Sequence, residues 1–236
     1  MLERNGFLST LEHALLSNDT NHNVRLEVAN TFFHIASYVT PTMHVTHQFT
    51  QMLLRLSGTT NISAHDTVLD NNTICVEISA RAILKMTLVA NNHCILIQTP
   101  GLLASLATMA LSTSLSSYHN YSNNSAIVAI RENATGALFN LSCTTNMQAK
   151  ESMLSDTHLL YVLVQISTYG NIENRYSRDF AVGTLVNLSC LPDARTKLVK
   201  FDGLLLSLIQ FVSDTTVEHS AKESVKSSII QLVSVI

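Results

Sequence analysis

The sequence predicts an all-α solenoid, in which short helical repeats stack on one another instead of enclosing a single core. A thirteen-residue pattern occurs five times along the 236-residue chain. Its two clearest copies begin at Arg131 and Arg178, and they share Arg, Ala, Gly, Leu, Asn, Leu, Ser and Cys at matching places. Successive copies lie roughly 44 to 55 residues apart, inside or slightly above the range of two- and three-helix repeats. Apolar residues follow a helical period, and strand-like alternation is scarce.

The best-formed repeat unit predicts three helices. Residues 146–153 suggest a short first helix, 159–166 a second helix and 177–190 a longer third helix. The following unit repeats this order after Pro192, with a turn at Asp202-Gly203. We therefore expect about four to five three-helix repeats, with incomplete repeats at both ends.

These repeats are expected to form a single domain that covers residues 1–236. Two polar segments, 57–73 and 112–125, are rich in turn-forming residues and predict surface loops, either tolerated insertions or a docking segment. The long third helices are expected near residues 24–38, 74–90, 126–143, 175–190 and 217–236.

One position of the pattern serves as a reference, because it is Asn in both strong copies. We call this reference position 0 and number the other residues of each copy from it. Positions −3, −2 and +1 are small or apolar, for example Ala137, Leu138 and Leu141. This spacing places them on one helix face, which we expect to pack between neighbouring units. The five residues at position 0 are His34, Lys85, Asn140, Asn187 and Gln231.

A second stripe of each third helix contains positions −4 and −7 together with position 0. In one strong copy these positions hold Gly136 and Asn133, and in the other they hold Gly183 and Phe180. Glycine inside a helix costs roughly 1 kcal/mol relative to Ala. Its presence at both −4 positions indicates either tight helix packing or an open surface. Glu27 is the acidic residue that falls on this stripe.

Residues 132–142 and 181–189, followed by Pro192-Asp-Ala-Arg-Thr-Lys-Leu-Val and Asp202-Gly-Leu-Leu, resemble armadillo repeats. The resemblance is strongest over about residues 126 to 212. It is similar in particular to the Ala-Ala-Gly-Ala-Leu-x-Asn-Leu-Ser version of beta-catenin-like and adenomatous polyposis coli-like proteins. The resemblance implies a right-handed superhelix whose third helices line a concave groove, where a ladder of Asn side chains holds an extended peptide.

Asn140 and Asn187 match the Asn ladder of that family. An amide is both donor and acceptor, so it can pair with any peptide unit, although an Asn here could instead bridge neighbouring helices. Nuclear-import adaptors of the family carry Trp one turn before the Asn, and this chain has no Trp, which argues against a receptor for basic import signals. The candidate groove residues are Asn140, Asn187, Asn133, Gly136, Phe180, Gly183, Lys85, Arg81, His34 and Gln231.

Composition and charge argue against several other classes of function. Only 13% of the residues are charged, the net charge is −3, and Lys and Arg do not cluster, which disfavours binding to nucleic acid or an anionic membrane. The longest apolar runs are about half of the roughly 20 residues that span a bilayer. We expect no membrane insertion and a soluble protein of the cytoplasm or nucleus, with its four cysteines as buried free thiols.

The sequence predicts no cofactor, no metal site and no enzymatic activity. His34, His44 and His47 lie near one another, but no Cys or carboxylate stands at the spacing of a zinc site. Phosphate-binding loops, nucleophile elbows and paired catalytic carboxylates are absent from the sequence.

The preferred hypothesis is a non-enzymatic scaffold that binds an extended segment of a partner protein along the groove. The alternative is a structural helical spacer, or a regulatory module of a larger protein, that uses its loops or flanks. The last helix has no terminating Gly and no charged outer face, so we also expect further repeats in a longer chain or end-to-end self-association.

Overall fold

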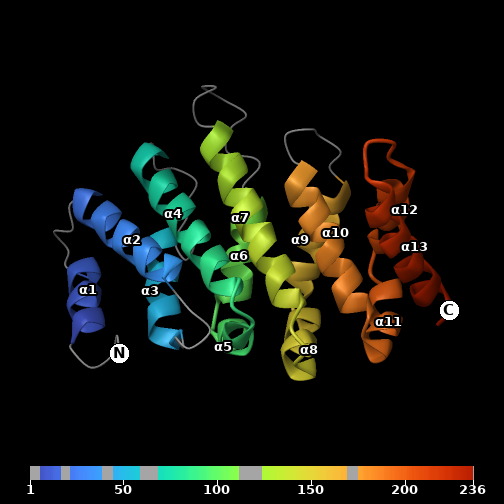
Figure 1. Cartoon of the computed structure of the whole chain (residues 1–236), viewed down its shortest axis with the longest axis horizontal. Helices are drawn as coiled ribbons and strands as arrows, with labels where there is room; N and C mark the ends of the chain where they lie inside the picture. The colour runs from blue at the N-terminus through green and yellow to red at the C-terminus, as the bar shows by residue number, and fades with distance from the viewer. Residues whose placement is uncertain are drawn as a thin grey trace.

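The computed structural model describes residues 6–16, 22–38, 45–58, 69–111, 124–168 and 175–235. Within these ranges the chain is almost entirely helical and contains no β-strand. The helices follow one another along the long axis of the molecule, from the N-terminal to the C-terminal end (Figure 1). The predicted all-α solenoid is therefore confirmed.

Three units of the solenoid each contain a short first helix, a second helix and a long third helix. They are preceded by two units that contribute two described helices each. The earlier units comprise α1 (Phe7–Leu16), α2 (His22–Ser37), α3 (His47–Ser57) and α4 (Leu69–Thr87). The first three-helix unit begins with the short 3-10 helix η1 (Ala90–Asn92) and continues with α5 (His93–Gln98), α6 (Leu102–Leu111) and α7 (Asn124–Ser142). The second unit comprises α8 (Met147–Ser155), α9 (Thr157–Thr168) and α10 (Arg175–Ser189). The third unit comprises α11 (Pro192–Val199), α12 (Leu204–Ser213) and α13 (His219–Val233).

Residues with specific backbone preferences set where the short helices begin. The Asn146 side chain accepts a hydrogen bond from the Ala149 N–H at 2.9 Å and so caps α8. Pro192 occupies the first turn of α11, where no backbone N–H is needed. Gly203 has a φ of 80° immediately before α12, a left-handed conformation that favours glycine. The predicted turn at Asp202-Gly203 is thus present.

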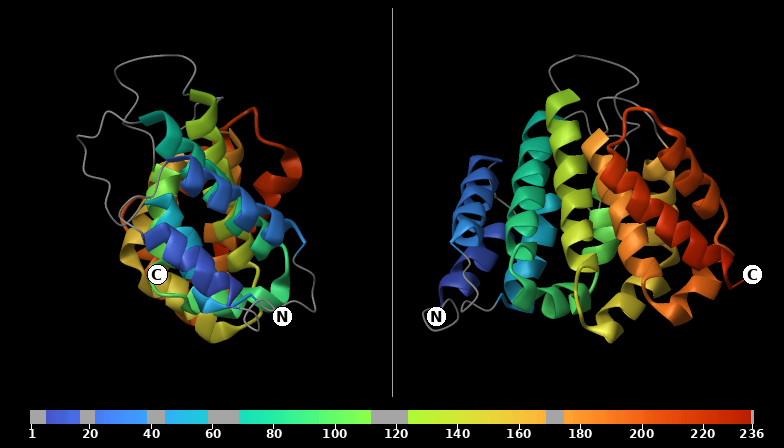
Figure 2. Two further views of the ribbon diagram at one scale, coloured as in Figure 1. Left: turned by 90° about the vertical axis from the view of Figure 1, so that its left-hand side faces the viewer. Right: turned by 45° about the vertical axis from the view of Figure 1, so that its right-hand side comes forward.

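The core lies between the third helices and the shorter helices behind them. α2 packs on α4, α4 on α7, α7 on α10, and α10 on α13, and Figures 1 and 2 show these five helices side by side. Ala137, Leu138 and Leu141 of α7 are completely buried, as the repeated apolar face predicted. Ile35 of α2 and Ile229 of α13 are only half-buried, because each of these helices packs on one described third helix instead of two.

The boundaries of two predicted loops differ from the structure. The segment predicted as a loop over 57–73 includes the last residue of α3 and the first five residues of α4, which begins at Leu69. The segment predicted over 112–125 includes the start of α7 at Asn124. Asp, Asn, Ser and Thr are common at helix N-termini, so polar composition did not mark where these helices begin. Residues 59–68 and 112–123 lie outside the described residues.

Helices α5 and α6 meet at a sharp bend. Gly101, with a φ of 81°, lies just before α6, and its carbonyl accepts a hydrogen bond from the Ser105 N–H at 2.9 Å. Among the described helices, none alone has both the length and the apolar composition of a membrane span. Residues Ala90–Gln98 and Leu102–Leu111, bent by 95°, meet that criterion only when they are taken together.

Candidate functional site

The third helices α2, α4, α7, α10 and α13 share an outward face, which we call the third-helix surface. Asn140 of α7 and Asn187 of α10 lie at equivalent places on it, and both are half-buried. Asn140 Nδ2 donates a hydrogen bond to Thr87 Oγ1 at 3.1 Å. Asn187 Nδ2 donates to Ser142 Oγ at 2.9 Å and contacts Cys143 Sγ at 3.3 Å. Each amide thus reaches back to the end of the preceding third helix.

The hydroxyl groups that receive these bonds are themselves fixed by the ends of their helices. Thr87 Oγ1 donates to the Leu84 carbonyl at 2.7 Å, and Ser142 Oγ donates to the Phe139 carbonyl at 2.6 Å. The last carbonyls of a helix lack backbone partners, so a hydroxyl two residues after position 0 satisfies one of them. Its oxygen is then left to accept the N–H of the Asn on the next helix.

The bridging bonds do not exhaust the hydrogen-bonding capacity of the two amides. A side-chain amide has two N–H donors and a carbonyl oxygen with two lone pairs. The carbonyl oxygens of Asn140 and Asn187 accept no hydrogen bond from the part of the chain that the structure describes. The surface therefore presents two acceptors in equivalent positions on adjacent helices.

Position 0 behaves differently towards the ends of the solenoid. Lys85 of α4 and His34 of α2 are both exposed. Gln231 of α13 accepts a hydrogen bond on its Oε1 from Arg195 Nη2 at 2.8 Å, and Arg195 Nε also donates to the Ser189 carbonyl at 3.1 Å. The carbonyl oxygen that stays open in Asn140 and Asn187 is therefore occupied in Gln231.

Arg81, at position −4 of α4, forms two contacts with its own protein. Its guanidinium carbon lies 4.7 Å from the centroid of the Phe33 ring on α2, a distance typical of a cation–π contact. Its Nη1 lies 3.9 Å from Glu77 Oε1, one turn earlier on α4. Arg81 is nonetheless about half exposed, and its side chain is part of the third-helix surface.

Gly136 and Gly183 permit close packing between α4, α7 and α10. A Cβ atom at Gly183 would lie 2.7 Å from Phe139 Cε2, and one at Gly136 would lie 3.4 Å from both Leu84 Cδ1 and Phe180 Cε2. The Phe139 and Phe180 rings pair with their centroids 5.7 Å apart. Of the two explanations that the sequence left open, the structure supports tight packing at Gly183, whereas a Cβ at Gly136 would make ordinary van der Waals contacts. The remaining predicted residue, Asn133, is half-buried on α7.

The sequence pattern missed a row of carboxylates on the third-helix surface. Position −8 is acidic in four consecutive third helices, and these residues are Glu77, Glu132, Asp179 and Glu223. Residues four apart on a helix lie on the same side, so position −8 adjoins position −4. The spacing contains this signal, but positions 0, −4 and −7 by themselves place only Glu27 on the stripe.

The two inner carboxylates of this row, Glu132 and Asp179, are half-buried. Burial raises the pKa of Glu132 because it disfavours the charged form, and the Arg131 charge opposes this change. Burial likewise raises the pKa of Asp179. The charges of Arg175 and Arg178 lower this pKa, and those of Asp214 and Glu218 raise it further.

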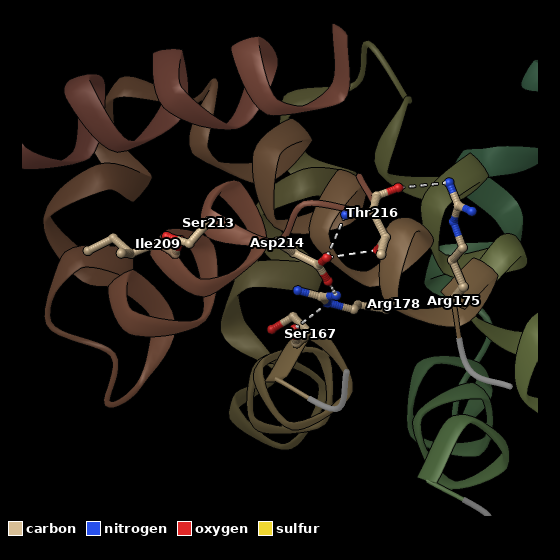
Figure 3. Close-up of polar contacts among 7 residues, drawn as sticks. All are labelled: Ser167, Arg175, Arg178, Ile209, Ser213, Asp214 and Thr216. Atoms are coloured by element: carbon tan, nitrogen blue, oxygen red, sulfur yellow. Dashed lines mark hydrogen bonds and ion pairs between the residues drawn. The ribbon is translucent and has the colours of Figure 1, made fainter. Parts of the chain in front are cut away.

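A buried arginine fixes the start of α10 against the last unit (Figure 3). Arg178 forms an ion pair with Asp214 in the connection between α12 and α13, and its Nε donates to the Ser167 carbonyl at the end of α9 at 3.2 Å. Its guanidinium carbon lies 5.1 Å from the centroid of the Phe211 ring. Arg178 therefore ties together α9, α10 and α12, and this contact helps to hold the third helices in register.

The Asp214 carboxylate also accepts two hydrogen bonds within its own turn. The Thr216 N–H and Oγ1 donate to Asp214 Oδ1 at 2.9 and 2.8 Å (Figure 3). The hydrogen bond from Arg178, followed by those from Thr216, holds the pKa of the Asp214 carboxyl well below its usual range. Arg178, the first residue of the repeated pattern in this unit, thus has a structural role that the sequence did not suggest.

The prediction that all four cysteines are buried was wrong for two of them. All four are free thiols, and Cys75 is buried and Cys94 half-buried, whereas Cys143 and Cys190 are exposed. These two residues stand three places after position 0, almost one turn further along the same outward stripe. Cys143 stays exposed although Asn187 Nδ2 of the next third helix lies 3.3 Å from its Sγ.

Comparisons with known proteins agree with this architecture. No family model matches the sequence, and no curated protein matches it. The designed armadillo repeat protein YIII(Dq)4CqI is similar in structure, with a TM-score of 0.62 and 17% identity over 98% of this chain and 84% of that chain. A second solved structure, of computationally designed armadillo repeat proteins for modular peptide recognition, gives a TM-score of 0.60 and 17% identity over 96% of this chain and 82% of that chain. The chain therefore has an armadillo-like repeat fold.

Proposed function

We propose that this protein is a non-enzymatic scaffold that holds an extended segment of a partner protein along a groove on its third-helix surface. The observation that carries the proposal is the pair of open carbonyl oxygens on Asn140 and Asn187. Every residue of an extended peptide other than proline offers one N–H and one C=O group, whatever its side chain. Amides repeated from helix to helix suit the capture of such a backbone, and Phe180 and Arg81 would add side-chain contacts.

The comparison with solved structures supports this proposal through the fold. One of the similar structures is of armadillo repeat proteins designed for modular peptide recognition, and the described part of this chain has a similar repeat architecture. We further assign the repeats to the beta-catenin-like and adenomatous polyposis coli-like type. Gly136 and Gly183 occupy position −4, where the import adaptors have Trp, so the partner is selected by other residues.

The bridging hydrogen bonds favour a second candidate function. Because the same amides join neighbouring third helices, a purely structural spacer or a regulatory module would also need them. In that case the Asn residues would stabilise the stack, and the surface would carry no peptide.

Binding of fluorescent peptides, selected on an array of random extended sequences, distinguishes the two candidates. The double variant Asn140→Ala/Asn187→Ala removes the open carbonyls and the bridging bonds together. The matched control, Thr87→Val/Ser142→Ala, removes acceptors of the bridging bonds but keeps both amides. A typical hydrogen bond contributes about 1 kcal/mol, so the first variant should weaken binding by about 10- to 30-fold. The control should change binding by about twofold or less.

Two results would contradict peptide capture. The array could select no peptide, or the control could lose as much affinity as the Asn variant at equal thermal stability. Either result would favour the structural alternative. Melting temperatures of all variants are needed, because both pairs of substitutions remove bonds between helices.

A further inference from the structure

The carboxylates at position −8 of the third helices differ in how they are neutralised. Glu77 of α4 lies 3.9 Å from Arg81, four residues later on the same helix. Glu223 of α13 accepts a hydrogen bond from Lys226 at 2.7 Å, three residues later. Both outer members of the row thus have a cation supplied by their own helix.

The two inner members of the row lack such a partner. Glu132 and Asp179 form no hydrogen bond or ion pair through their side chains with the residues that the structure describes. Four residues after each of them, where α4 has Arg81, the chain has glycine. The charges of nearby arginines lower the pKa of both carboxyls, Arg131 that of Glu132 and Arg175 and Arg178 that of Asp179. The two arginines of α10 have other partners: Arg175 Nη2 donates to the Thr216 carbonyl at 3.3 Å, and Arg178 is paired with Asp214. Two half-buried carboxylates therefore remain without a cation in contact.

An aromatic pair lies beside these carboxylates. Phe139, at position −1 of α7, and Phe180, at position −7 of α10, are both half-buried, so part of each ring faces outward. The Phe139 ring lies against Gly183 and the Phe180 ring against Gly136, and these glycines at position −4 are midway along the helix between position 0 and position −8. They offer an apolar platform of the kind on which the stems of Lys and Arg side chains pack.

The contact between α2 and α4 shows how the protein fills the equivalent place elsewhere. There, Phe33 at position −1 supports Arg81 at position −4 of the next helix, and Glu77 at position −8 faces the same guanidinium. Between α7 and α10 the ring and the carboxylate are again present, as Phe139 and Asp179. The arginine is replaced by glycine, so the cation that completes this arrangement is missing.

We propose that a Lys or Arg side chain of the bound segment supplies this cation, with its stem on the Phe139–Phe180 pair and its charge at Asp179 or Glu132. This inference rests on the proposed function, because the segment must lie beside Asn140 and Asn187 for its side chains to reach these groups. Eight residues of helix separate position 0 from position −8, about 12 Å along the axis. That interval accommodates an extended basic side chain together with the carboxylate side chain. The bound segment thus carries a Lys or Arg where it passes α7 and α10.

Three labelled peptides test this selectivity by fluorescence anisotropy. Each has about 12 residues, which at roughly 3.3 Å per residue passes four third helices spaced about 10 Å apart. Ser alternates with Lys in the first peptide, with Gln in the second and with Glu in the third. The Lys peptide should bind about tenfold more tightly than the Gln peptide, and this difference should shrink as salt is added. The Glu peptide should bind no more tightly than the Gln peptide.

Variants of the inner carboxylates assign the preference to this place. Glu132→Gln and Asp179→Asn should each weaken binding of the Lys peptide by about three- to tenfold while leaving the Gln peptide unchanged. Glu151→Gln, an exposed carboxylate on α8, is the matched control and should change neither.

The results separate the failure of this inference from the failure of the proposed function. Equal binding of all three peptides, weakened in each case by Asn140→Ala/Asn187→Ala, would overturn the basic selectivity and leave peptide capture intact. A preference for Lys that survives both carboxylate variants would also overturn it. Binding that is absent, or that does not depend on Asn140 and Asn187, would overturn the proposed function and this inference with it.

Discussion

Replacing Gly183 by Ala inserts one methyl group between α10 and α7, where the structure leaves no room for it. The new Cβ atom would lie 2.7 Å from Phe139 Cε2 and 2.9 Å from Cδ2, well inside the normal contact distance of about 3.5 to 4.0 Å. Phe139 also packs against Phe180. Alanine gains about 1 kcal/mol of helix propensity, whereas overpacking typically costs about 1 to 3 kcal/mol. We expect a net loss of about 1 kcal/mol in the free energy of unfolding.

Gly136→Ala is the matched control, because Gly136 occupies the equivalent position of α7. Its Cβ atom would meet Leu84 Cδ1 and Phe180 Cε2 at 3.4 Å, the edge of ordinary contact. The gain in helix propensity should therefore outweigh any strain, and the variant should be more stable than the wild type by about 0.5 to 1 kcal/mol.

Equilibrium urea denaturation, followed by circular dichroism, measures both variants on one scale. The two alanine substitutions should differ by about 1.5 to 2 kcal/mol. Adding Phe139→Leu to Gly183→Ala should recover part of the loss, because Leu lacks the ring edge that the methyl group meets. Equal changes at the two glycines, or no recovery with Phe139→Leu, would refute the packing explanation.

Two further predictions concern acid stability and thiol reactivity. The folded-state pKa of Asp214 lies well below the ordinary value of about 3.9, so its stabilising contribution is complete above that pH and is lost as the pH falls towards the folded-state pKa. Asp214→Asn should lower the free energy of unfolding at neutral pH by about 2 kcal/mol and flatten its decline below about pH 4, measured by urea denaturation. An equally steep acid decline in the variant would count against this assignment. Iodoacetamide should label exposed Cys143 and Cys190 long before Cys75, whose burial also raises its thiol pKa, and a bound peptide should slow the first two. Mass spectrometry that found equal rates for the three thiols would contradict the structure.

The repeat architecture could be predicted because its signal recurs in each unit. Small and apolar residues at positions −3, −2 and +1 mark the buried face of every third helix, and Ala137, Leu138 and Leu141 are completely buried. The starts of α4 and α7 could not be placed in the same way. Polar residues are compatible with both a loop and the first turn of a helix, so only the backbone separates the two.

The candidate site was predictable in its positions but not in its bonds. The repeat identified Asn140 and Asn187 as equivalent residues on adjacent helices. Their bridging partners, Thr87 and Ser142, lie 53 and 45 residues away in the sequence. The pairing depends on the register between two helices, which a pattern within one helix does not specify.

The sequence by itself determined the solenoid, its buried face and the regular placement of the two Asn residues, because these features follow from a period that each unit repeats. Tertiary structure alone decided that the Phe139 ring packs against Gly183 and that Cys143 is exposed. It also decided that Arg178 pairs with Asp214. Each of these outcomes depends on what a neighbouring helix or turn places at the same point in space, and that distance has no counterpart along the chain.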